Sequence, residues 1–277
     1  MAGAAGCRGA DRASWAEKAD AVCARAGERI AALGRPASLD DVGPTARRTA
    51  RHLGAAGAQL RQLERPEKDP DITRVTRGFG VAQRGLVSFA DAVARGDDRS
   101  AILALRGLER ERRRWSDAAA AVGMRRCAGG ERLTAALDAL RKPLYEHGLG
   151  EVLADYNGPI ARAYEAAEAP SARGQDRRLD NAWSALDDLR NRVSALEPPG
   201  SVARASRTWS ARLEAVEDAM FDLMESMARP DSQATVDHRY RLMRRAIRAE
   251  YEARRRVLRG LDVSGSVAVL PAETRES

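Results

Sequence analysis

The most chemically reactive side chains in this 277-residue chain are three cysteines and three histidines, and they lie far apart in the sequence. They are Cys7, Cys23, Cys127, His52, His147 and His238. None of them has the CxxC, HExxH or ExxH spacing that places metal ligands together on a helix. Glycine-rich phosphate loops of the GxGxxG or Walker type are also missing from the sequence. The pattern predicts no metal site, no cofactor and no catalytic centre, so we expect a protein that is not an enzyme.

Arginine runs are the next candidates for a binding role. Residues 1–129 contain 24 Lys and Arg against 16 Asp and Glu, whereas residues 130–277 contain 23 against 24. A basic first half can bind an anionic polymer or a phospholipid surface. The alternative is a solvated helix face on which arginines pair with nearby glutamates, in a genome whose codons favour arginine. The candidate anion-binding residues are Arg110, Arg112, Arg113, Arg114, Arg125 and Arg126. No DNA-reading motif accompanies them, so nucleic acid is the weaker prediction.

The elements that must carry these residues are predicted to be helices throughout. Alanine and arginine dominate the sequence and are strong helix formers, while β-hairpin signals are nearly absent. "SWAE" (Ser14–Glu17) has the pattern of a capping box at the start of a first helix. Apolar residues then recur every three or four positions through four segments, and Pro70 suits the first turn of the third segment. The pattern predicts an up-and-down four-helix bundle over residues 14–129.

A second helical bundle is predicted over residues 130–262, followed by a disordered tail at 263–277. Its first helix is expected to run from Arg132 to Glu146 and to break in the glycine-rich segment "HGLGEVLADYNGPI" at 147–160. Apolar stripes then follow in three further segments. The methionines of this half are expected to fill its core. They are Met220, Met224, Met227 and Met243.

Short matches between the two halves suggest an internal duplication. "LRQLERP" (60–66) resembles "VSALEPP" (193–199), and each closes a predicted helix. "ARGD" (94–97) matches "ARPD" (228–231) at an offset of 134, and Leu108 matches Leu242 at the same offset. We therefore predict tandem bundles derived from one duplicated helical unit.

The first thirteen residues are predicted to be a flexible N-terminus. "AAGC" (Ala4–Cys7) has the form of the last residues of a bacterial lipoprotein cleavage box, in which the cysteine receives the lipid. The chain as given shows no apolar stretch before it, so a disordered cytosolic start with a chance cysteine is the alternative. No window approaches the roughly 20 apolar residues of a membrane span.

Two interpretations of Cys23 and Cys127 remain open on the residues alone. As free thiols in a reducing cytosol, Cys23 would be a small buried residue and Cys127 an exposed one. As a disulfide, they would join the first helix to the segment after the fourth, which is its neighbour in an up-and-down bundle. Because Cys23 lies two to three turns into its helix, "GMRRC" (123–127) would have to fold back along that helix.

Several motifs in order resemble a family of uncharacterised bacterial lipoproteins and secreted all-helical proteins. They are "WAEKADAVCARAGERIAALGRPASLDDV", "LRQLERP", "ADAVARGDD" and "AVGMRRCAGG", which together cover residues 14–130. The resemblance implies that Cys23 and Cys127 form a disulfide and that Cys7 carries a lipid. It implies no particular activity. The chain departs from the family in having "LERP" where the family has L-x-P-P.

Two functions follow as hypotheses. The first is a non-enzymatic, lipoprotein-like protein of the cell envelope that binds or scaffolds, held at the membrane surface by a lipid or in contact with an anionic polymer. The second is a cytosolic arginine-rich helical protein that binds nucleic acid or a protein partner. Compartment separates the two, because disulfides persist mainly in oxidising compartments.

Overall fold

The structure is a computed structural model that describes residues 11–66, 69–168, 175–229 and 231–261. Within these ranges all regular secondary structure is helical, which confirms the predicted all-α fold. The chain forms two compact units, one of residues 1–144 and one of residues 145–277. Cys7 and the predicted tail at 263–277 lie outside the described residues.

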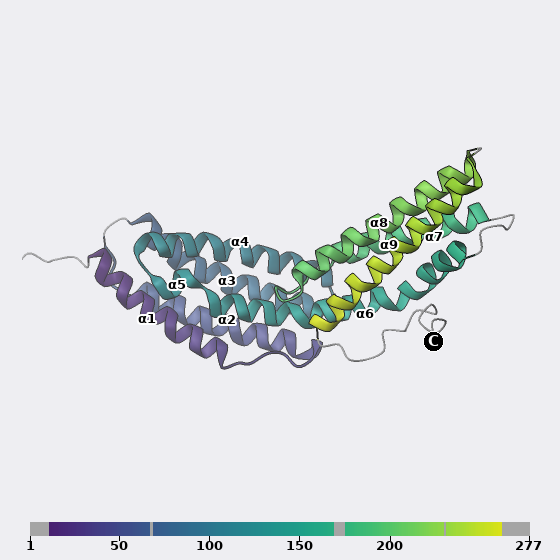
Figure 1. Ribbon diagram of the computed structural model, residues 1–277. Coiled ribbons are helices and arrows are strands. Elements are labelled where there is room, and N and C mark those ends of the chain that lie inside the picture. Colours follow the sequence, from purple (N-terminus) through teal and green to yellow (C-terminus); the bar gives the residue numbers. More distant parts are fainter. Residues whose placement is uncertain (1–10, 67–68, 169–174, 230, 262–277) are drawn as a thin grey trace, which may run out of the picture. The chain divides into compact units, whose positions relative to one another are not determined.

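The first unit is built on four long helices. They are α1 (Arg12–Ala31), α2 (Leu39–Gln62), α3 (Pro70–Ala94) and α4 (Asp98–Val122). Consecutive helices run antiparallel and pack against each other (Figure 1). The apolar stripes of all four helices face inward, including Trp15, Leu60 and Phe89. The predicted up-and-down arrangement of this segment is therefore confirmed.

The first helix begins earlier than the capping-box pattern predicts. Asp11 is the N-cap of α1, and its Oδ1 accepts a hydrogen bond from the Ser14 amide at 2.7 Å. Aspartate is as good an N-cap as serine, so the helix gains almost a full turn, and the prediction that Ser14 caps it was wrong. The prediction for the third helix is confirmed, because Pro70 occupies the first turn of α3 after the N-cap Asp69.

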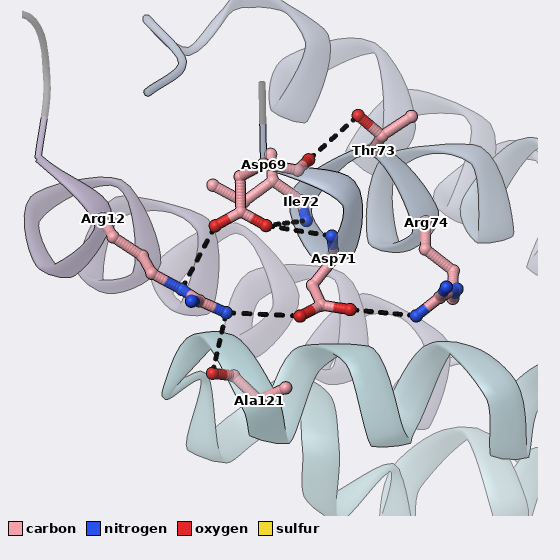
Figure 2. Close-up of polar contacts among 7 residues, drawn as sticks. All are labelled: Arg12, Asp69, Asp71, Ile72, Thr73, Arg74 and Ala121. Carbon is pink, nitrogen blue, oxygen red and sulfur yellow. Dashed lines mark hydrogen bonds and ion pairs between the residues drawn. The ribbon is translucent and has the colours of Figure 1, made fainter. Parts of the chain in front are cut away.

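Arg12 fastens one end of this bundle (Figure 2). Its guanidinium lies 3.2 Å from Asp69 and 3.3 Å from Asp71 at the start of α3, and it donates to the carbonyl oxygen of Ala121 at the end of α4 at 2.9 Å. One side chain thus joins the start of α1 to two other helices. Because the pairs are partly exposed, the contacts fix the helix ends more than they stabilise the fold.

Glycines bring α3 and α4 close together. A Cβ at Gly78 would lie 2.9 Å from Cβ and Cε3 of Trp115, and a Cβ at Gly85 would lie 2.7 Å from Cδ2 of Leu108. Any larger residue would have to push these side chains aside. The absence of a side chain at both positions therefore sets the spacing of this helix pair.

The boundary between the units falls inside α6 (Glu131–Glu168), which follows the short α5 (Arg125–Gly129). The predicted break at 147–160 was wrong, because α6 is one continuous helix of 38 residues. Gly148 is retained within it for a packing reason: a Cβ there would lie 2.8 Å from Cδ2 of Leu196. The segment contains three glycines, each of which costs a helix about 1 kcal/mol. Leu149 and Val152 of the same segment are buried in the core of the second unit, and such packing supplies most of a helix's stability, so α6 persists.

The second unit adds α7 (Gln175–Ala195), α8 (Ala203–Ala228) and α9 (Gln233–Gly260). α8 packs along α9 and against α7. Met220 and Met243 are fully buried in this core, and Met224 and Met227 pack against it. The expected role of the methionines as core residues is therefore confirmed.

Candidate functional site

A disulfide joins Cys23 of α1 to Cys127 of α5, with 5.4 Å between their Cα atoms. This is the pairing that the family resemblance implies, and the Cα separation is ordinary for a disulfide. A chain reversal after α4 makes it possible. Gly123 has a left-handed φ of 91° and donates to the carbonyl of Ala120, while Met124 donates to that of Ala119. This Schellman motif turns the chain back toward α1.

Asp20 holds α5 in place from α1. Its Oδ1 accepts hydrogen bonds from the backbone amides of Arg126 at 2.6 Å and of Cys127 at 3.0 Å. Amides in the first turn of a helix have no partner within that helix, and Met124, the residue before α5, provides no side-chain cap. Asp20 therefore caps α5 from a different helix and sets Cys127 beside Cys23, three residues further along α1.

Next to the disulfide lies a half-open cavity of about 200 Å³ within the first unit. Both cysteines line it. Its apolar lining includes Ile30, Leu53, Phe79, Trp115 and Leu133. Its charged lining is Arg125, Arg126, Glu131 and Arg132. The lining thus combines apolar side chains with an excess of positive charge.

Trp115 forms part of the apolar lining and brings an unused hydrogen-bond donor. Its side chain stacks on Phe79 with the ring centroids 4.4 Å apart, and the residue is only 5% exposed. Its Nε1 is buried and has no hydrogen-bond partner in the described part of the chain. Buried indole N–H groups usually have an acceptor.

The cavity gathers a subset of the predicted anion-binding arginines. Arg125 and Arg126 line it and are exposed, which places them on its solvent side. Arg112 approaches the same region, because its Nη1 would lie 3.2 Å from a Cβ at Gly130. Arg112 is half-buried, and its Nε has no hydrogen-bond partner among the described residues.

The other predicted arginines lie elsewhere. Arg110, Arg113 and Arg114 are exposed on α4 and do not line the cavity. Arg114 pairs with Glu111 at 3.6 Å, as expected of a solvated helix face. In this run of arginines, Arg112 therefore faces the cavity region, and the other three face solvent. This alternation follows from the 3.6-residue period of the helix.

Sequence reasoning missed the cavity, the Trp115 donor and the Asp20 cap. A faint signal existed for Asp20, since its spacing of three from Cys23 places both on one face of a helix. The cavity had no signal, because its lining comes from six helices that only the fold brings together.

No helix in the described ranges is long and apolar enough to cross a membrane. Comparisons with protein-family models, with curated proteins and with solved structures gave no match to the chain. The family resemblance and the lipid on Cys7 therefore remain predictions.

Proposed function

We propose that the protein is a non-enzymatic, lipoprotein-like binding module of the bacterial cell envelope. The observation that carries the proposal is the disulfide between Cys23 and Cys127, which closes a loop with a sequence separation of 104. Such bonds persist in secreted and periplasmic proteins and are rare in the reducing cytosol. Cys7, the third cysteine, would remain for lipid attachment near the membrane surface.

Binding is favoured over a purely scaffolding role by the cavity beside the disulfide. Concave sites with an apolar lining and a few converging polar groups are typical of small-molecule binding. Here the disulfide and Asp20 fix the cavity wall that carries Arg125 and Arg126. A wall held in this way requires little ordering when a ligand arrives, and this preorganisation raises affinity.

The two units are proposed to descend from one duplicated helical unit. In support, α3 ends at Ala94 and α8 ends at Ala228, at the offset of 134 shown by the sequence matches. A long helix follows each of them after a short turn, α4 in the first unit and α9 in the second.

Peptide mapping of protein isolated from its native cells tests the compartment. Free thiols are alkylated before lysis, and trypsin is applied without reduction. We expect a linked pair of peptides, residues 19–25 and residues 127–132, which separates after reduction of a parallel sample. Full alkylation of both cysteines would overturn the proposal. It would favour the cytosolic alternative, for which retention of duplex DNA at physiological salt is the further test.

A further inference from the structure

We propose that the cavity of the first unit binds a small amphipathic carboxylate, with its apolar body against Trp115 and its carboxylate toward Arg125 and Arg126. This inference rests on the proposed binding role and adds the chemical class of the ligand. Three observations carry it: the size of the cavity, its aromatic and aliphatic lining, and the excess of positive charge in that lining.

The size of the cavity limits the apolar body. An apolar cavity of about 150 Å³ is large enough for benzene, and this cavity has about 200 Å³. It therefore has room for one aromatic ring, or a short alkyl chain, and a carboxylate. The cavity is too small for a nucleotide or for a long acyl chain held along its whole length.

The aromatic and aliphatic lining of the cavity suits an apolar body. Trp115 and Phe79 are stacked with their ring centroids 4.4 Å apart, and Ile30, Leu53 and Leu133 belong to the same lining. An apolar group that packs against these side chains is removed from water, which favours binding.

The charged side chains of the lining select an anion. Arg125 and Arg126 have no side-chain hydrogen bond or ion pair within the described ranges. Arg132 is engaged with Glu28 at 3.5 Å, and Glu131 contributes a negative charge to the lining. The two available guanidinium groups thus outweigh one carboxylate. Guanidinium groups match the planar geometry of a carboxylate, and a cationic ligand would be repelled.

The test uses two ligands of equal size, 3-phenylpropionate and its uncharged analogue 3-phenylpropionamide. Purified, oxidised full-length protein is titrated with each, followed by calorimetry and by tryptophan fluorescence. We expect the carboxylate to bind at least about tenfold more tightly than the amide, since only the carboxylate makes charge-assisted hydrogen bonds. Equal affinity for both, or no binding of either up to about 10 mM, would overturn the inference.

Two double variants that remove the same number of arginines test whether the ligand binds at the cavity. R125A/R126A is expected to weaken binding of the carboxylate to the level of the amide. R110A/R113A removes the same charge from the outer face of α4 and is expected to change the affinity by less than about twofold. The inference fails if both double variants weaken binding equally, because the effect would then come from net charge alone. Both variants alter exposed residues, so both are expected to fold.

W115F tests whether the ligand lies against Trp115, because it keeps an aromatic ring and removes the indole fluorophore. We expect the fluorescence response to disappear, while calorimetry still shows the preference for the carboxylate. A fluorescence response that persists in W115F would overturn the placement of the apolar body against Trp115. Failure of these titrations with the Cys23–Cys127 peptide pair intact overturns the ligand class alone, whereas free thiols with binding retained overturn only the compartment.

Discussion

In the first unit a disulfide ties α1 to α5, whereas in the second unit a hydrogen bond to a buried carboxylate of α9 joins α8 to α9. Trp209 of α8 donates to Glu250 of α9 at 2.6 Å, and Arg254 lies 3.5 Å from the same carboxylate. Glu250 and Arg254 are almost completely buried. In the first unit the buried Arg141 of α6 pairs with Glu109 of α4 at 3.1 Å, but the Glu109 side chain is 31% exposed. The buried Thr49 and Thr76 of this unit donate to carbonyls of their own helices.

The difference shows two physical ways of fixing antiparallel helices. A disulfide acts mainly by restricting the unfolded chain, so its removal weakens the fold without leaving an unsatisfied group inside. A buried ion pair acts in the native state, and loss of one partner leaves the other charged and desolvated. The first unit should therefore respond to the redox potential, and the second to single substitutions and to pH.

The largest effect is expected from opening the disulfide. C23S/C127S should destabilise the first unit by roughly 4–5 kcal/mol, the loop-closure value for about a hundred residues, and leave the second unit unchanged. Amide hydrogen exchange resolved by helix measures this, because protection should fall in α1–α4 and stay constant in α7–α9. C7S is the control, since it removes a cysteine outside the bond. Equal loss of protection in both units would show that the units do not differ in this way.

Breaking the buried pair is the reciprocal experiment in the second unit. E250L removes the carboxylate that pairs with the buried Arg254 and accepts the Trp209 N–H, which should cost roughly 3–5 kcal/mol. The double variant E250L/R254M removes both charges and should recover most of that loss. Urea unfolding of E250L, R254M and the double variant gives the coupling energy. A loss below about 1 kcal/mol in E250L would mean that Glu250 does not hold α8 and α9 together.

The comparison of the units also shows which features of the structure could be predicted from the sequence. Periodic apolar residues were sufficient to predict the helices, the core methionines and the antiparallel order of the first unit. The disulfide was accessible only through the resemblance, because a link between Cys23 and Cys127 depends on the reversal at Gly123. The cavity and the Glu250–Trp209 contact depend on helix rotation and on contacts between distant segments, which periodicity does not determine. The glycines in α6 were given too much weight, because burial of Leu149 and Val152 in the same segment outweighs their low helix propensity.

The smallest of the three expected effects is a pH dependence of the stability of the second unit, which comes from Glu217. Burial raises the pKa of Glu217 from its ordinary value of 4.5 to about 7, although Arg190 at 3.1 Å opposes the shift. The folded protein therefore holds a proton that the unfolded chain releases between these two pKa values. The stability contributed by this group is fully present below pH 4.5 and is lost as the pH rises through 7.

E217Q should remove this dependence, because glutamine cannot ionise and still fits the site. At pH 8 we expect E217Q to be more stable than the unsubstituted protein by on the order of 1–3 kcal/mol, with the two converging below pH 4.5. Unfolding of the second unit measured by hydrogen exchange across this range checks it, and the first unit should show no difference between the two proteins. E252Q, at an exposed position of α9, is the matched control. If E217Q is less stable than the unsubstituted protein at pH 8, the ion pair between Glu217 and Arg190 outweighs the cost of burying the charge of Glu217. The second unit would then depend on its buried charges at every pH.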